Sequence, residues 1–304
     1  MSELPPPPPS RTLGASGIEI GPIAWGMWRL AANGRRRAEA ARLVHTALDA
    51  GITLLDTADI YGFDGERGFG DAETLLGEVL AAEPSLRDRM VLATKGGIAP
   101  PLPYDQSAAY LRGAIEASLR RLRTETIDLY QVHRPDILAH PQEVARTLDD
   151  AVASGKVRTL GVSNFTTAQI AALGHFLGHS LVTTQPEISP LTIDCFENGE
   201  LDQAMQLGLT PLAWSPLGGG RLADPGTPRE QAVAAALDAV AAAQGVSRPV
   251  AAYGWLMAHP AGIVPIVGSQ NPDRIAEAAA ATRLRWTRQQ WYAVLVAARG
   301  APLP

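Results

Sequence analysis

Four titratable side chains of complementary chemistry stand at or just after the ends of short apolar segments. Asp56 closes the run ITLLD, Tyr61 follows in the next loop, Lys95 closes VLATK and His133 closes IDLYQVH. A tyrosine with its ordinary pKa of about 10 is a poor acid at neutral pH, but a neighbouring ammonium lowers that pKa and a carboxylate holds the ammonium charged and in place. Taken singly, each residue also fits a structural role, such as capping a loop or packing. Together, the four predict a tuned proton donor built on Tyr61.

These side chains act together only if the fold brings the ends of several segments to one place. After an expected hairpin at Arg11–Gly21, short apolar segments alternate with stretches of helical periodicity, which is typical of repeated βαβ units and a parallel sheet. The predicted strands are Ile23–Gly26, Thr53–Asp56, Val91–Thr94, Ile127–Val132, Thr159–Val162, Val182–Gln185, Thr210–Trp214 and Ile263–Val267. The predicted helices between and after them are Ala38–Ala50, Ala72–Ala82, Ser107–Leu122, Pro141–Ser154, Thr167–Leu177, Glu200–Leu207, Arg248–His259 and Pro272–Ala281.

This alternation predicts an α/β fold, a (β/α)8 TIM barrel, with the hairpin before it and extra helical runs at Pro228–Ala243 and Thr287–Arg299. A doubly wound sheet is the main rival, but the G-x-G-x-x-G fingerprint directly after the first strand is missing. The glycine cluster Gly218–Gly220 instead follows the seventh strand, where barrels commonly place phosphate-binding loops. Because a barrel's active site lies at the C-terminal ends of its strands, we expect the four titratable side chains on one rim.

The composition limits the kinds of partner that we expect for this protein and the compartment in which we expect it. The chain has 304 residues, with 26 basic and 31 acidic side chains and a net charge of -5, so nothing indicates the positive face that nucleic acid requires. Cys195 is the single cysteine, which excludes an intramolecular disulfide and favours a cytoplasmic location. No apolar run has the length of a membrane span, and no histidine has partners at metal-ligand spacing. We therefore expect no membrane, nucleic acid or metal partner, and the sequence leaves the oligomeric state open.

Two units are expected along the chain. The first ten residues, MSELPPPPPS, have neither a basic n-region nor an apolar core and predict a disordered, proline-rich tail over residues 1–10. Residues 11–304 are expected to form a single barrel domain, since neither extra helical run has its own core-forming set of elements.

Several segments together resemble the signatures of the aldo-keto reductases, and the resemblance leaves only the proline tail outside it. Within the family, GMWRL at Gly26–Leu30, EISPL and WSPLGGG are similar to the bacterial YdhF-like oxidoreductases. The segments that carry the family resemblance are Gly51–Gly62 (GITLLDTADIYG), Val91–Gly97 (VLATKGG), Ile127–Asp136 (IDLYQVHRPD), Gly155–Phe165 (GKVRTLGVSNF), Thr183–Leu191 (TTQPEISPL), Leu212–Leu222 (LAWSPLGGGRL) and Val264–Ile275 (VPIVGSQNPDRI).

The resemblance implies an oxidoreductase that reduces aldehydes or ketones to alcohols by hydride transfer from NAD(P)H. Asp56, Tyr61, Lys95 and His133 match the family's catalytic tetrad, in which the tyrosine protonates the carbonyl oxygen and the histidine orients the carbonyl. The small-molecule carbonyl substrate is expected to be an apolar or aromatic aldehyde or an activated ketone, because tryptophans near the first strand and C-terminal aromatic residues offer an apolar wall.

The resemblance also implies a cofactor site. Gly268 stands where many members carry a lysine that pairs with the 2'-phosphate, so NADP(H) should be preferred through Arg274, with reduced discrimination and NAD(H) still possible. Ser163–Asn164 could instead form only a turn before a helix, and Gly218–Gly220 only a flexible connection. The implied contacts are Ser163, Asn164 and Gln185 to the nicotinamide amide, Trp214 to its ring, Ser215, Leu217 and Gly218 to the pyrophosphate, Gly268, Ser269 and Arg274 to the adenosine phosphate end, and Met27 and Trp28 to the nicotinamide ribose or the substrate.

Two other classes of function stay open at this point. A cofactor-binding sensor or regulatory protein with slow turnover would keep the same nicotinamide site. A barrel lyase or metal-assisted hydrolase would use the same rim residues, but no cluster of histidines and carboxylates supports it.

Overall fold

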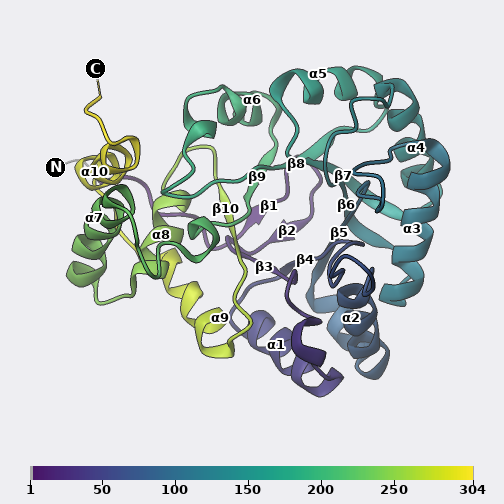
Figure 1. The fold of residues 1–304 in the computed structure, drawn as a ribbon, viewed down its shortest axis with the longest axis horizontal. Coiled ribbons are helices and arrows are strands. Elements are labelled where there is room, and N and C mark those ends of the chain that lie inside the picture. The colour runs from purple at the N-terminus through teal and green to yellow at the C-terminus, as the bar shows by residue number, and fades with distance from the viewer. Residues whose placement is uncertain (1–2, 304) are drawn as a thin grey trace.

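The computed structural model describes residues 3–303, and its centre is a closed barrel of parallel strands (Figure 1). The strands follow one another around the barrel in chain order, and the last strand pairs with the first. Each strand overlaps its predicted segment, so the predicted (β/α)8 fold is confirmed. The strands are β3 (Ala24–Gly26), β4 (Leu54–Asp56), β5 (Val91–Gly96), β6 (Ile127–Val132), β7 (Val157–Ser163), β8 (Leu181–Gln185), β9 (Thr210–Ala213) and β10 (Val264–Val267).

Helices ring the strands on the outside (Figure 1). The last predicted barrel helix ends earlier than expected, because the α-helix stops at Ala278 and the chain continues as a 3-10 turn, η5 (Ala279–Arg283). No helix in residues 3–303 is long and apolar enough to cross a membrane. The ring helices are α1 (Arg37–Asp49), α2 (Asp71–Ala82), α3 (Ala108–Leu122), α4 (Pro141–Ala153), α5 (Thr167–Phe176), α6 (Glu200–Leu207), α8 (Arg248–Met257) and α9 (Pro272–Ala278).

The two extra helical runs also form helices, α7 (Pro228–Gln244) and α10 (Arg288–Arg299), which pack on each other beside the barrel (Figure 1). Both begin with a capping box: the side chains of Thr227 and Thr287 accept hydrogen bonds from the third backbone N–H of their helices. The N-terminal segment meets this part of the fold. Glu3 forms a bridge with Thr287, and the Leu4 N–H donates to the Trp286 carbonyl at 2.7 Å.

The expected disordered tail therefore differs from the structure at Glu3 and Leu4, because backbone hydrogen bonds and a partly buried leucine fix them against the body. For Met1 and Ser2 the expectation lies outside the described residues.

The predicted hairpin is present as β1 (Arg11–Thr12) and β2 (Glu19–Ile20), and it closes one end of the barrel. Leu13 and Ile20 are almost fully buried and pack with apolar side chains of the barrel interior. The Gly14 N–H donates to the Thr210 hydroxyl at 2.8 Å, which fastens the hairpin to the start of β9. The larger second core lies between the strands and the helices. Since apolar groups fill the hairpin end, polar side chains inside the barrel gather toward the other end.

We predict that Gly77→Ala destabilises the fold because α2 and α3 touch at this glycine. A Cβ at Gly77 would stand 1.9 Å from the Arg121 carbonyl oxygen, a rigid backbone atom. Overpacking of this kind costs about 1–3 kcal/mol. Gly113→Ala in α3 is the matched control, because a Cβ there meets no atom within 4 Å and alanine favours a helix by about 0.5–1 kcal/mol. Urea unfolding measures both, and equal stability of the two variants would contradict the prediction.

Candidate active site

The alternation of side chains along each strand brings the predicted residues to one layer. Leu54 and Ala93 belong to the apolar interior of the barrel. Asp56 and Lys95 lie two residues further along the same strands, so their side chains point to the same face one layer higher. His133 follows the end of β6. The layer lies at the C-terminal ends of the strands, where barrels carry their active sites.

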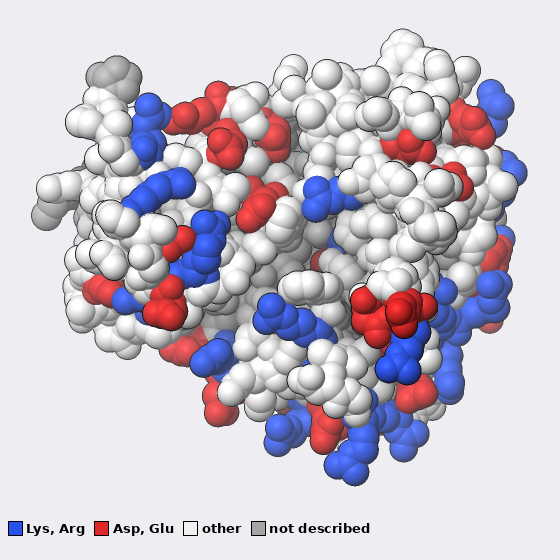
Figure 2. All heavy atoms as spheres, viewed as in Figure 1, with Lys and Arg blue, Asp and Glu red and all other residues white. Residues whose placement is uncertain are grey.

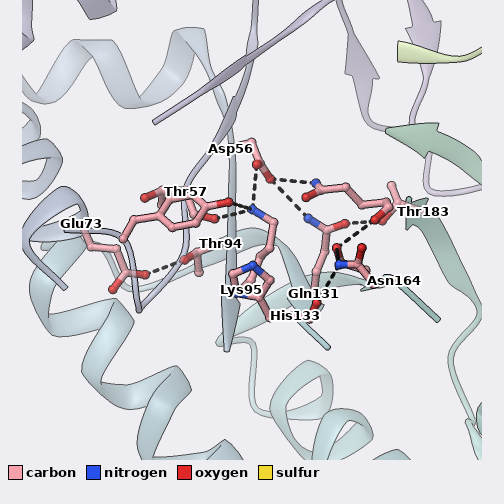
Figure 3. Close-up of polar contacts among 12 residues, drawn as sticks. Asp56, Thr57, Glu73, Thr94, Lys95, Gln131, His133, Asn164 and Thr183 are labelled. Atoms are coloured by element: carbon pink, nitrogen blue, oxygen red, sulfur yellow. Dashed lines mark hydrogen bonds and ion pairs between the residues drawn. The ribbon is translucent and has the colours of Figure 1, made fainter. Parts of the chain in front are cut away.

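The structure brings the four predicted titratable groups into contact, and Figure 3 shows Asp56, Lys95 and His133 among them. Lys95 is fully buried, and its Nζ lies 2.7 Å from Asp56 Oδ2. The same Nζ donates to the Thr57 carbonyl at 2.8 Å and to the Tyr61 hydroxyl at 3.2 Å. The ring of His133 stands edge-on to Tyr61, with 5.8 Å between the ring centroids. One lysine thus connects a buried carboxylate to the phenol.

A second set of polar groups satisfies the other oxygen of the Asp56 carboxylate. Of these groups, only Gln185 was predicted from the sequence. Asp56 Oδ1 accepts from Gln131 Nε2 at 3.3 Å and from Gln185 Nε2 at 3.1 Å, and the Thr183 hydroxyl donates to Gln131 Oε1 at 3.2 Å (Figure 3). A Cβ at Gly161 would lie 2.0 Å from the Thr183 hydroxyl oxygen, so glycine makes room for this contact. The available signal was Gln131 itself, a polar residue in an apolar strand, two residues before the histidine.

Burial changes the proton affinity of the site. It raises the pKa of Tyr61 above the ordinary 10.0, although the Lys95 ammonium opposes the shift. The expected lowering of this pKa is therefore not seen, because desolvation of the phenolate outweighs the nearby charge. Burial alone would lower the pKa of Lys95, but Asp56 and Tyr61 outweigh it and raise the pKa above 10.5. The phenol thus stays protonated at neutral pH while its lysine partner stays charged.

His133 stays neutral at the same pH. Burial lowers its pKa well below the ordinary 6.5, and the positive charges of Lys95 and Arg134 lower it further. A neutral imidazole offers one N–H donor and one acceptor nitrogen. It can therefore position a polar substrate atom beside the Tyr61 hydroxyl without competing as an acid.

The polar residues predicted to meet a planar amide also lie together beside this layer. The Ser163 hydroxyl donates to the Gln185 carbonyl at 2.8 Å, and Asn164 Nδ2 donates to the Ser163 hydroxyl at 2.8 Å and to the His133 carbonyl at 3.2 Å. Trp214 Nε1 donates to Asn164 Oδ1 at 3.0 Å, which fixes the indole next to them. Asn164 makes tertiary contacts across the barrel mouth rather than a local turn.

The loop after β9 has the shape of an anion cradle. Ser215 and Gly218 have positive φ angles of 50° and 61°, so the chain curls here. In the described part of the chain, the backbone N–H groups of Ser215 and Leu217 donate to no acceptor. A curled loop with free N–H groups suits a phosphate. These two N–H groups are thus available to a phosphate group.

The loop after β10 offers a second polar surface. Gly268 is exposed with no atom near its missing Cβ, and the Ser269 carbonyl accepts from Trp25 Nε1 at 3.0 Å. Arg274 is exposed at the start of α9, and its guanidinium forms no hydrogen bond or ion pair within residues 3–303. It is thus available to an anionic ligand.

Met27 does not lie where it was expected. It is fully buried in the outer core, so it has no surface to offer a ligand, whereas the neighbouring Trp28 is 63% exposed. The chain leaves β3 at Gly26 and turns, with the Leu30 N–H donating to the Met27 carbonyl at 2.9 Å, and the Met27 side chain packs into the outer core. Of the two residues predicted here, only Trp28 is accessible.

The face that carries the strand ends is hollowed at its centre, and blue and red side chains alternate around the rim (Figure 2). No cluster of three or more His, Cys, Asp or Glu side chains that could hold a metal ion occurs among the described residues.

Comparison with known proteins agrees with this geometry. The Aldo/keto reductase family model matches residues 22–295, so the chain belongs to the aldo/keto reductase family and is an oxidoreductase. Members of this family use nicotinamide cofactors. A solved structure of the thermostable aldo-keto reductase Tm1743 with the inhibitor epalrestat has the same fold, with a TM-score of 0.83 over 95% of this chain and 99% of that chain at 24% identity.

Three bacterial proteins are similar to this chain over nearly its whole length. The chain is 77% identical over 304 residues, the whole of both chains, to the 6-dehydroglucose reductase of Novosphingobium aromaticivorans. It is 40% identical to the 6-dehydroglucose reductase of Agrobacterium fabrum over 93% of this chain and 96% of that one. It is 37% identical to the oxidoreductase YdhF of Escherichia coli over 96% and 98% of the two chains, so the expected similarity to YdhF is confirmed.

We predict that Lys95→Met destabilises the protein more than Lys95→Met combined with Asp56→Asn. The single variant leaves a buried carboxylate without its cation, which costs about 3–5 kcal/mol, while the double variant removes both charges and keeps the oxygen that accepts from the two glutamines. Urea unfolding of wild type, both singles and the double gives the coupling free energy. Additive effects of the two substitutions would show that the pair is not coupled.

Proposed function

We propose that this protein is an NAD(P)H-dependent reductase that converts the aldehyde of 6-dehydroglucose to a primary alcohol, with Tyr61 as the proton donor. The observation that carries the proposal is the contact chain from Asp56 Oδ2 through Lys95 Nζ to the Tyr61 hydroxyl, at 2.7 and 3.2 Å. A tyrosine in water, with no lysine beside it, would have no ammonium to stabilise the phenolate that forms when it gives up its proton. The relative that is 77% identical over its full length supports the choice of substrate.

The reaction adds a hydride to the carbonyl carbon and a proton to the carbonyl oxygen. The bound nicotinamide supplies the hydride. Tyr61 transfers its hydroxyl proton to the oxygen as negative charge develops there, and the Lys95 ammonium stabilises the phenolate that remains. His133, neutral and edge-on to Tyr61, donates a hydrogen bond to the same oxygen and orients it. Asp56 keeps the ammonium in place throughout.

The side chains present fit a nicotinamide dinucleotide. The free N–H groups of Ser215 and Leu217 suit the pyrophosphate, and the unpaired Arg274 suits a phosphate on the adenosine ribose. The residues that would hold the remaining parts are Ser163, Asn164 and Gln185 for the amide, Trp214 and Trp28 for the ring and ribose, Gly218 for the pyrophosphate, and Gly268 and Ser269 for the adenosine end.

A hydroxylated aldehyde replaces the apolar one that the sequence predicted. Met27 and Trp25, which were expected to form an apolar wall near the first strand, are both fully buried and cannot contact a substrate. Trp28 is the accessible aromatic residue of that segment. The name of the 77% identical relative also points to a sugar aldehyde.

We predict that Tyr61→Phe lowers kcat for 6-dehydroglucose by about 100-fold or more, because it removes the general acid. Cofactor affinity should stay near that of wild type, since Tyr61 contacts Lys95 and His133 rather than the cofactor loops. Steady-state oxidation of NADPH measures turnover, and quenching of tryptophan fluorescence measures binding. Tyr110→Phe is the control, because that hydroxyl bonds the Ile98 carbonyl outside the tetrad. Wild-type turnover in Tyr61→Phe would refute the tetrad, and a wild type that binds NADPH without turnover would indicate the sensor.

We predict that NADPH binds more tightly than NADH and that Arg274→Ala removes most of the difference. The charged hydrogen bonds that a guanidinium gives to a phosphate contribute roughly 1.5–3 kcal/mol, and NADH lacks that phosphate. Dissociation constants of both cofactors for wild type and variant measure the effect. Arg283→Ala, an exposed arginine after α9, is the control. If Arg274→Ala weakened both cofactors equally, or neither, Arg274 would not read the 2'-phosphate.

A further inference from the structure

An arginine without a protein partner stands at the mouth of the site. Arg134 directly follows His133 and is partly buried, and its guanidinium carbon lies 5.7 Å from the centre of the Trp214 ring. Its charge acts inside the site: it lowers the pKa of His133 together with burial and Lys95, and it opposes the rise that burial causes in the pKa of Tyr61. Within residues 3–303 the guanidinium makes no hydrogen bond and no ion pair. All of its N–H donors are therefore free for a ligand.

The backbone that carries this arginine is fixed. Gln106 is almost fully buried, and its side-chain amide donates to the Arg134 carbonyl. The Gln106 N–H donates in turn to Asp136 Oδ2 at 3.2 Å, which ties the loop after β5 to the loop after β6. Asn164 fixes the facing indole through Trp214 Nε1. The Arg134 backbone and the Trp214 indole are therefore in place before a ligand binds, which reduces the cost of ordering this part of the site.

The pair has the chemistry of a site for hydroxyl groups. An indole presents a flat apolar surface with a polar N–H edge, and a guanidinium presents N–H donors in a fixed plane. The N–H edge of Trp214 is already used by Asn164, and Arg134 lies over the indole ring, so the donors left for a substrate are those of the Arg134 fork. The hydroxyl oxygens of a sugar chain are acceptors that suit these donors.

The pair offers a bound anion a single cation. The other cation of the site, Lys95, is fully buried and points to Asp56 and Tyr61, so it does not reach outward to a second charge. We propose that Arg134, supported by Trp214, is a specificity residue that hydrogen-bonds the hydroxyl groups next to the reacting carbonyl of a neutral polyhydroxylated aldehyde. The inference rests on the proposed function and names the part of the site that selects its substrate class.

The test compares aldehydes that differ only in hydroxyl groups. D-glyceraldehyde and propanal have the same three-carbon chain, and 6-dehydroglucose extends the series. Arg134→Gln should lower kcat/KM for D-glyceraldehyde and 6-dehydroglucose by about 10- to 100-fold, mostly through KM, since hydrogen bonds to a charged group are lost. Its effect on propanal should stay within about 3-fold, because a hydroxyl-free aldehyde never made those bonds. Arg134→Lys, which keeps the charge and loses the planar fork, should lie between the two.

A matched control distinguishes the loss of Arg134 from the general effect of removing an arginine that lies over an aromatic ring. Arg288 stacks on Tyr292 with a centroid distance of 5.8 Å at the start of α10, a geometry close to that of Arg134 over Trp214, so Arg288→Gln should leave all three substrates unchanged. Melting temperature and the dissociation constant of NADPH should match wild type in every variant. These readings confirm that a change in selectivity does not come from folding or cofactor binding.

Two results would overturn the inference. One is an equal loss on propanal and D-glyceraldehyde, which would mean that Arg134 acts through Tyr61 or His133. The other is a wild type that prefers glyceraldehyde 3-phosphate to D-glyceraldehyde in a way that Arg134→Gln abolishes, which would mean an anion site. A wild type that fails to reduce 6-dehydroglucose would refute the proposed substrate alone, because the three-carbon pair still tests Arg134.

Discussion

The ion pair between Lys95 and Asp56 is the interaction on which the site depends. An ammonium that is fully buried inside a barrel is costly unless a carboxylate and further acceptors surround it. Here Nζ has a carboxylate, a backbone carbonyl and a phenol as partners, and the carboxylate has two glutamine amides on its other oxygen. These hydrogen bonds to the ion pair therefore fix the positions of the phenol and of the two glutamine amides.

The same network joins Tyr61 to Ser163, Asn164 and Trp214 on the other side of the layer. Gln185 donates to Asp56 from its side chain and accepts from Ser163 at its backbone. Asn164 then links that serine to the carbonyl of His133 and to the indole of Trp214. A displacement of the Asp56 carboxylate would therefore change the positions of both Tyr61 and the Trp214 indole. This connection holds groups from β4, β5, β6, β7 and β8 in one geometry.

The remainder of the fold supplies a packed base and the loops at the opposite end of the barrel. The hairpin side chains Leu13 and Ile20 fill the far end of the barrel, so the polar layer rests on a packed apolar floor. Loops after β5, β6, β9 and β10 carry polar groups around the mouth of the site, and the hydrogen bond from Gln106 to the Arg134 carbonyl holds the loop after β6. Specificity can thus change in these loops without disturbing the ion pair below.

The sequence by itself determined the order of strands and helices, because apolar runs and helical periods are local patterns. It also predicted that Asp56, Tyr61, Lys95 and His133 lie together, because barrel geometry gathers residues at strand ends. It could not determine the direction of the Tyr61 pKa shift, since the spacing of residues contains no measure of desolvation. It missed Gln131 and Thr183, whose roles depend on contacts between strands that are distant in the chain. Only the tertiary structure decided that Met27 turns inward and that Arg134 faces an indole without an acidic partner, because both follow from how loops pack on one another.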